Sequence, residues 1–173
     1  AGVNYDADVL EAMVRVEGPA VSLLAAVMIG DWVAESGESV HDVVAATGIR
    51  GQSPRGTSRV QVMPSGPGES RDGLLQVMLA LVGAAQREIV MTTPYFVPDD
   101  ALVLALRGAV ARGVRLVLVL PARIDSILVR FASRSFYDEI MELGGEICFF
   151  QDGLLHTKSI AVDGTLALFG TAN

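Results

Sequence analysis

The sequence predicts an α/β fold in which a mixed β-sheet is flanked by helices. Beyond residue 59, segments with helical apolar spacing alternate with short apolar segments that are bounded by Gly and Pro. Residues 114–120 are almost entirely apolar, which is typical of a strand covered on both faces. Asp163 and Gly164, between two apolar segments, are a strong signal for a two-residue β-hairpin. The pattern is therefore a βαβαβαβ series that ends in a hairpin.

Local signals place the individual elements along the chain. Pro19 suits the first turn of a helix, and Asp99 or Asp100 can cap another helix that Gly113 ends. The expected helices cover 19–35, 71–87, the stretch between Asp100 and Gly113, and 125–143, and the expected strands cover 59–63, 88–93, 114–120, 146–150, 157–162 and 166–169. Between 37 and 58 the pattern gives way to Gly, Ser, Thr, Pro and Arg, which indicates a linker or a long surface loop.

The composition disfavours several classes of function. Thirteen basic and twenty acidic residues give a net charge of -7, whereas a protein that coats nucleic acid needs a basic face. Polybasic anchoring at a membrane surface is equally unsupported. With 51% apolar and 19% charged residues the chain is not a disordered one. No signal peptide is recognisable, and the apolar stretch 19–30 is too short to span a bilayer.

Cysteine and histidine usage gives no sign of a metal site or of a cofactor. Cys148, the single cysteine, lies in the apolar segment 147–150, so we expect a buried, inert thiol. No pair of Cys and His has the spacing of zinc ligands. His41 falls within the expected linker and is expected to be a solvated side chain.

Lys158 and His156 are the most conspicuous polar residues in the chain. Lys158 is the only lysine among the thirteen basic residues, and His156, one of two histidines, lies two positions before it. On a strand, residues two apart project from the same face. An imidazole that can attack or transfer a proton would then lie beside a compact ammonium donor, which suits the binding of one phosphate.

Further polar and small residues are expected near this pair. Asp163 follows at the hairpin turn, and the returning strand would bring Gly170, Thr171 and Asn173 close to the start of its partner. Each has a structural explanation when taken alone, since Asp-Gly is what a tight hairpin requires and Asn173 can be a loop amide. Their joint spacing is more specific than any one of them.

This joint pattern, His-x-Lys, four residues, Asp, six residues, Gly-Thr-x-Asn, resembles the HKD motif of the phospholipase D superfamily. Other segments are similar to bacterial cardiolipin synthases and occur in the same order: 16–19 with Asp31 and Trp32, 65–67, 93–99 and 112–114. Two features depart from the family. Thr171 stands where Ser is usual, and the chain has one HKD motif where family members pair two.

The resemblance implies a phospholipase D-like lobe that carries one HKD half. It implies metal-free and cofactor-free phosphodiester exchange through a phosphohistidine, with His156 as general acid and base. Lys158 and Asn173 would bind phosphate oxygens, Asp163 would orient a histidine, and Gly170 and Thr171 would contact the substrate. The first motif would come from a missing N-terminal half or from a second copy.

The resemblance also implies a substrate, a location and a division of the chain. The substrate would be a phospholipid such as phosphatidylglycerol, and the enzyme would be associated with the bacterial inner membrane through segments outside this chain. Residues 1–36 would be the helical tail of a preceding lobe, 37–58 a linker, and 59–173 the HKD lobe, truncated after Asn173. Without an initiator Met, the sequence is expected to be a fragment of a longer protein.

Three alternatives remain open at this point. A phospholipase D-type hydrolase would use the same motif with water as acceptor. A dimeric HKD nuclease would pair two identical motifs, although the acidic composition disfavours nucleic acid as a partner. The chain alone could also be a non-catalytic or oligomerisation lobe.

Overall fold

The computed structural model describes residues 9–66, 70, 72–123 and 127–171. The chain divides into two compact units, one formed by Ala1–Ala12 with Ser70–Asn173 and the other by Met13–Glu69. The expected functional division at residues 36 and 58 stays a prediction.

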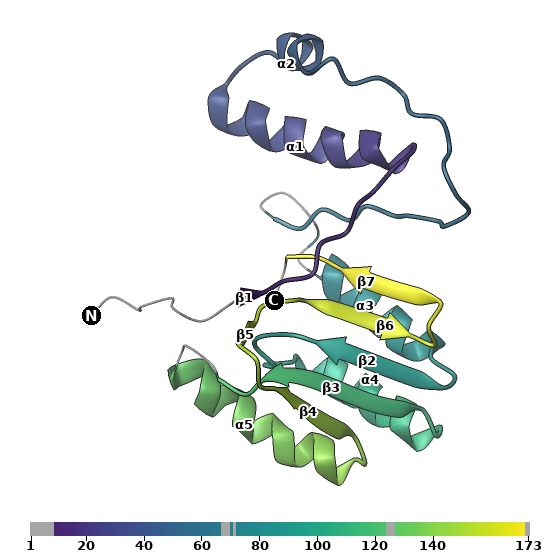
Figure 1. The fold of residues 1–173 in the computed structure, drawn as a ribbon, viewed down its shortest axis with the longest axis vertical. Coiled ribbons are helices and arrows are strands. Elements are labelled where there is room, and N and C mark those ends of the chain that lie inside the picture. The colour runs from purple at the N-terminus through teal and green to yellow at the C-terminus, as the bar shows by residue number, and fades with distance from the viewer. Residues whose placement is uncertain (1–8, 67–69, 71, 124–126, 172–173) are drawn as a thin grey trace. The chain divides into compact units, whose positions relative to one another are not determined.

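The larger unit is built on a five-stranded mixed sheet, as the sequence predicts (Figure 1). In the order β4-β3-β2-β6-β7, the first three strands are parallel, β6 is antiparallel to β2, and β7 is antiparallel to β6. The strands are β2 (Glu88–Thr92), β3 (Arg115–Pro121), β4 (Glu146–Phe150), β6 (Ser159–Val162) and β7 (Leu166–Phe169). The β6–β7 hairpin turns where the Asp-Gly signal predicts it, but through the three residues Asp163, Gly164 and Thr165 rather than through two, because Val162 pairs with Leu166.

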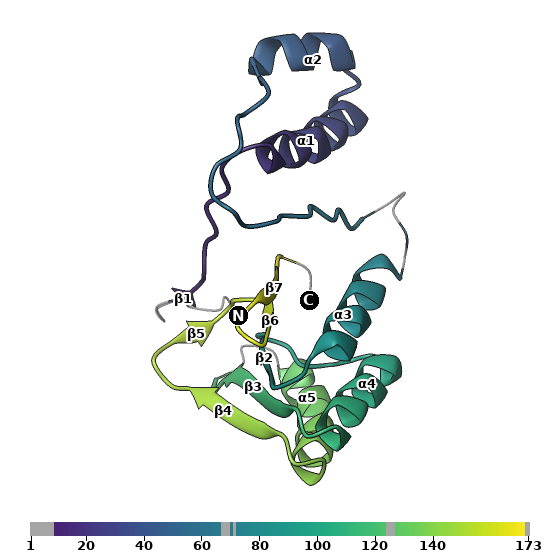
Figure 2. The same ribbon diagram turned by 90° about the vertical axis from the view of Figure 1, so that its right-hand side faces the viewer.

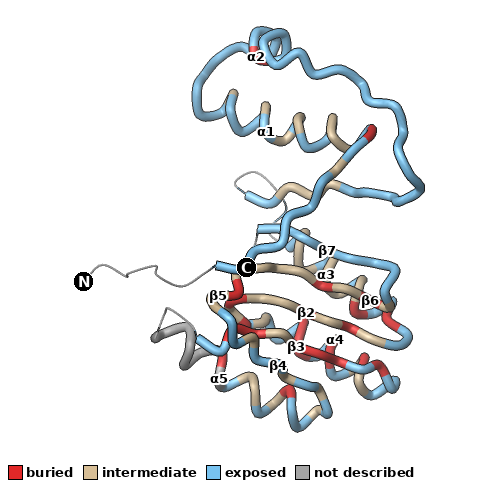
Figure 3. Tube along the Cα trace, viewed as in Figure 1, coloured by how far each residue is buried: buried red, intermediate tan, exposed pale blue. Residues whose placement is uncertain are grey.

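Three helices cover one face of this sheet (Figure 2). They are α3 (Gly73–Ala84), α4 (Asp100–Ala111) and α5 (Ile127–Glu142), and the Asp99 side chain caps α4 by accepting the Ala101 N–H at 2.8 Å. Alternate residues of the strands face these helices and form the core. Figure 3 shows the buried positions of these strands and helices in red. The core residues with at most 1% exposure include Leu116, Leu118, Leu120, Val82, Leu106 and Ile140. The fold class predicted from the sequence is therefore confirmed.

The beginnings of the three parallel strands are tied together by one arginine. The Arg115 guanidinium at the start of β3 bonds both carboxylate oxygens of Glu146 on β4, at 2.7 and 2.8 Å, and also Glu88 on β2. The hydrogen bonds from Arg115 lower the pKa of Glu146 below its ordinary value. These charges are exposed, so we assign them a role in aligning the strands rather than a large share of the stability.

A second, two-stranded sheet joins distant parts of the larger unit. The strand β1 (Val9–Leu10) pairs in parallel with β5 (Leu154–Leu155), with Leu10 opposite Leu155. Two-residue strands carry too little periodicity to be predicted from sequence. The sequence therefore gives no warning that the start of the chain lies beside the residues that precede β6.

The smaller unit corrects two expectations. The segment 37–58, expected as a linker or loop, contains the helix α2 (Val40–Thr47), which the Ser39 side chain caps by accepting the Asp42 N–H at 3.3 Å. The strand expected over 59–63 is not formed, because the alternating pattern there has no partner strand to bond with. The longer helix α1 (Ala20–Ser36) packs on α2 and has no buried residue, although most of its side chains are apolar.

Candidate active site

His156 and Lys158 lie at the edge of the sheet where the parallel strands end. They follow β5 and lead into β6, whose first residue, Ser159, pairs with Thr92, the last residue of β2. In open α/β sheets, ligands bind outside the carboxyl ends of the strands. The candidate residues therefore occupy the position at which such a fold normally presents its site.

The two side chains meet, with one residue between them in the sequence. Lys158 Nζ lies 3.2 Å from Nε2 and 3.3 Å from Nδ1 of His156, and it donates to the His156 carbonyl oxygen at 2.9 Å. A compact ammonium and an imidazole thus form one cluster. This arrangement can place a positive charge and a proton-transfer group on the same phosphate.

Glu11 completes the cluster, and the sequence reasoning missed it. Its Oε1 atom lies 2.6 Å from His156 Nδ1, across 145 residues of sequence. A carboxylate only accepts hydrogen bonds, so this contact assigns a proton to Nδ1 and leaves Nε2 as the nitrogen that can attack or exchange a proton. A signal for Glu11 was lacking, because its place depends on the two-residue strand β1.

Two effects shift the pKa of Lys158 in opposite directions. Burial lowers the pKa of Lys158 below its ordinary value, and the negative charge of Glu11 acts in the opposite direction. An anion bound beside Nζ would favour the charged form in the same way that Glu11 does. The cluster is therefore suited to bind a negatively charged group.

The end of the hairpin brings one more predicted residue to the cluster. The Gly170 N–H donates to the Lys158 carbonyl at 3.3 Å, because β7 ends at Phe169 opposite Ser159. Thr171 follows directly and is exposed. Asn173 lies outside the described residues, so its role stays a prediction.

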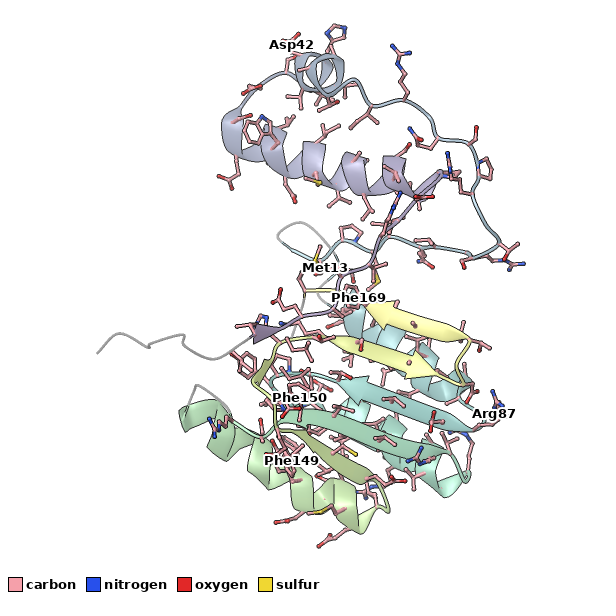
Figure 4. All side chains as sticks on the ribbon, in the orientation of Figure 1. Met13, Asp42, Arg87, Phe149, Phe150 and Phe169 are labelled. Carbon is pink, nitrogen blue, oxygen red and sulfur yellow. The ribbon has the colours of Figure 1, made fainter. Side chains whose placement is uncertain are left out.

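Asp163 does not lie with the cluster and therefore does not orient His156. Its carboxylate accepts the N–H groups of Gln86, Arg87 and Glu88 at 2.8 to 2.9 Å, at the opposite end of β6 from Lys158. Figure 4 shows Arg87 at this hairpin end of the sheet. The hydrogen bonds, the one from Glu88 first, lower the pKa of Asp163. Asp163 thus joins the hairpin to the start of β2.

The expectation of a buried thiol at Cys148 is wrong, because this cysteine is exposed. It lies on the edge strand β4 opposite Val119, and because its neighbour Ile147 packs against the core, Cys148 projects from the other face of the sheet. Among the described residues, no group of three or more His, Cys, Asp or Glu side chains could hold a metal ion. In the same part of the chain no helix is long and apolar enough to cross a membrane.

Comparison with known proteins identifies the family. The family model "Cardiolipin synthase, PLD-like domain" matches residues 78–173, which is more than half of the chain. The chain belongs to this family. It thereby also belongs with the phospholipase D-like proteins that the spacing of His156 and Lys158 indicates.

Curated relatives match nearly the whole chain. Cardiolipin synthase A of Serratia proteamaculans is 42% identical over 164 residues, covering 95% of this chain and 34% of that protein. Cardiolipin synthase A of Proteus mirabilis is 41% identical over 173 residues, covering 100% and 35%. Among solved structures, the phospholipase D family member Nuc from Salmonella typhimurium aligns with a TM-score of 0.48 at 23% identity, covering 57% of this chain and 63% of that one. The chain spans about a third of the length of the curated relatives it matches.

Proposed function

We propose that this chain provides one half of the active site of a cardiolipin synthase-type phosphatidyl transferase. The observation that carries the proposal is the cluster of His156, Lys158 and Glu11 at the carboxyl end of the parallel strands. The 42% identity between this chain and cardiolipin synthase A of Serratia proteamaculans supports the choice of a phospholipid as substrate. The other half of the site would come from a second HKD motif, on polypeptide outside this chain or on a second copy.

The first step forms a covalent intermediate. The histidine of the partner motif attacks the phosphorus of phosphatidylglycerol, so that a P–N bond forms and the P–O bond to the glycerol headgroup breaks. His156 donates the proton from Nε2 to the departing glycerol oxygen. During this step Glu11 stabilises the imidazolium from the side of Nδ1. The products are a phosphatidyl-histidine and free glycerol.

In the second step His156 acts as a general base instead of a general acid. Nε2, now without a proton, accepts one from the hydroxyl of an acceptor, which is a second phosphatidylglycerol or a related phosphatidyl lipid. The acceptor oxygen attacks phosphorus, the P–N bond breaks, and the partner histidine is regenerated. Transfer to a lipid hydroxyl yields cardiolipin, whereas transfer to water would yield phosphatidic acid.

The remaining residues stabilise charge on the phosphate. Lys158 and Asn173 would bind the non-bridging oxygens, which carry more negative charge in the transition state. Gly170 and Thr171, at the end of β7, would line the phosphate position, and the hydroxyl of Thr171 supplies the donor that Ser supplies in the family pattern. We also propose that the enzyme works at the membrane that holds its lipid substrate.

Replacement of His156 tests this proposal. In the intact enzyme, His156→Ala removes the general acid and base, and we expect the turnover of phosphatidylglycerol to fall by roughly 10³-fold or more. His41→Ala is the matched control, because His41 is exposed and lies in the smaller unit, and it should keep full activity. Product analysis measures cardiolipin and phosphatidic acid separately. Full activity of His156→Ala would contradict the site, and phosphatidic acid as main product would indicate a hydrolase.

A further inference from the structure

The pairing of β1 with β5 continues beyond the two strands, up to the candidate site. The ladder pairs Leu10 with Leu155, and the His156 N–H then donates to the Leu10 carbonyl at 2.9 Å. In a parallel ladder the next hydrogen bond would run from the Ala12 N–H to the His156 carbonyl. Glu11 lies between these two bonds, so both of them bear on where its carboxylate is held.

The structure replaces this next ladder bond with a side-chain one. The His156 carbonyl accepts the Lys158 ammonium at 2.9 Å, and the Ala12 N–H donates instead to Thr157 Oγ1 at 3.0 Å. The Thr157 hydroxyl thus substitutes for a carbonyl that Lys158 occupies. This bond fixes the backbone at Ala12, directly after Glu11, while the bond from His156 to the Leu10 carbonyl fixes the backbone directly before Glu11.

We propose that Thr157, the residue between the histidine and the lysine of the motif, is a positioning residue that holds Glu11 against His156. Glu11 is a long side chain that is 57% exposed, so its own surroundings do not confine it. A backbone fixed on both sides limits the rotamers that bring Oε1 to Nδ1. Thr157 therefore acts on the tautomer of His156 through Glu11.

The effect of this residue can be measured on His156 itself. The chain has only two histidines, so the ring-nitrogen signals of His156 and His41 can be followed by two-bond ¹H–¹⁵N spectroscopy of the 173-residue chain. In the neutral form, the wild type should keep the His156 proton on Nδ1. Thr157→Val removes the acceptor at similar volume, and it should shift the signals towards a mixture of both tautomers, as Glu11→Ala also should. Thr157→Ser should restore the wild-type signals.

Internal and matched controls separate this role from a general effect on folding. His41 lies in the smaller unit, and its signals should not change in any variant. Thr165→Val makes the same substitution at an exposed position of the hairpin, and it should leave His156 unchanged. If Thr157→Val fails to fold, Ala12→Pro removes the same hydrogen bond from the donor side, and it should shift His156 in the same way.

Turnover provides a second readout, and only this part rests on the proposed function. In the intact enzyme, Thr157→Val should lower kcat by about tenfold with little change in KM, because misplaced catalytic groups affect the chemical step more than binding. Thr157→Ser should stay within about twofold of the wild type, since it keeps the hydroxyl.

Wild-type ring signals in both Thr157→Val and Ala12→Pro would overturn the inference. The same holds if Thr157→Ser behaves like Thr157→Val, because the hydroxyl would then not be the operative group. Neither result depends on activity. An active His156→Ala would instead overturn the proposed function and leave the spectroscopic result in place.

Discussion

Lys158 shows at the residue scale why lysine and arginine differ. Of the thirteen basic residues in the chain, Lys158 is the only lysine and the other twelve are arginines. Its ammonium reaches both the carbonyl oxygen and the ring nitrogens of His156, within 2.9 to 3.3 Å. A planar guanidinium is wider and presents its donors in a fixed fork, so it could not make these contacts from the same place.

Lys158→Arg should therefore impair catalysis although it keeps the charge. We expect kcat of the intact enzyme to fall by about a hundredfold, as when one donor to a transition-state oxygen is lost. The measurement is the initial rate of cardiolipin formation from phosphatidylglycerol. Arg107→Lys makes the reverse exchange in an exposed ion pair with Glu139 and should keep wild-type activity. A wild-type rate in Lys158→Arg would show that Nζ makes no close phosphate contact.

Individual residues also show how far the sequence could predict the site. The rarity of lysine and histidine and their spacing were enough to find His156 and Lys158. The motif groups Asp163 with His156 and Lys158, but the predicted hairpin turn already places it at the opposite end of the strand from Lys158, and the structure agrees with the turn. Glu11 could not be found, since it approaches His156 from a distant part of the chain.

The β6–β7 hairpin shows at the element scale how a turn and a strand start stabilise each other. Asp163 has a φ of 55°, in the left-handed region that Asp and Asn tolerate better than most residues. Its carboxylate accepts three backbone N–H groups around the start of β2, and the Arg87 side chain donates to its carbonyl at 2.8 Å. Asp163, five residues after Lys158, thereby joins the turn to the central strand β2.

Asp163→Asn should reduce stability without changing the turn, because Asn tolerates the same backbone conformation. The amide keeps one acceptor oxygen but replaces the other by an NH2 donor that faces the backbone N–H groups, so we expect a lower urea midpoint at neutral pH. The pKa of Asp163 is lowered in the folded state, so its contribution is fully present above the ordinary value of 3.8 and is lost as pH falls through the folded pKa.

The pH dependence gives this prediction its control. The difference in urea midpoint between wild type and Asp163→Asn should be constant from about pH 5 to 8 and should shrink below the ordinary Asp pKa. Unfolding curves followed by circular dichroism measure it. A difference that does not change in acid would mean that the three hydrogen bonds do not depend on the charge of the carboxylate.

Elements with strong local signals were predicted, and those that depend on tertiary partners were not. The strands β2, β3, β4, β6 and β7 and the helices α3, α4 and α5 lie where the apolar pattern predicts them, within a few residues. The cap of α2 at Ser39 was overlooked among Gly and Ser residues, whereas β1 and β5 exist only as a pair. Glu11 follows β1 and His156 follows β5, so the contact between them depends on elements that the sequence does not predict.

At the scale of the whole molecule, the proposed reaction needs two histidines with opposite tasks. His156 is the one histidine of the larger unit, since His41 belongs to the smaller one, and its contacts suit it to proton transfer. The nucleophile must then come from another HKD motif. A polypeptide as long as the curated relatives, about three times the length of this chain, would have room for a second motif, whereas a second copy could supply one only by pairing identical motifs.

The dependence of rate on concentration distinguishes these two sources. If the second motif belongs to the same polypeptide, the 173-residue chain alone should turn over phosphatidylglycerol at less than about 1% of the rate of the intact enzyme, since one member of a catalytic pair is missing. Specific activity should then stay flat as chain concentration rises. If copies pair, specific activity should rise with concentration and reach a plateau, and His156→Ala should abolish it. The first outcome is expected, because a histidine held by Glu11 for proton transfer is poorly prepared to act as nucleophile for an identical partner.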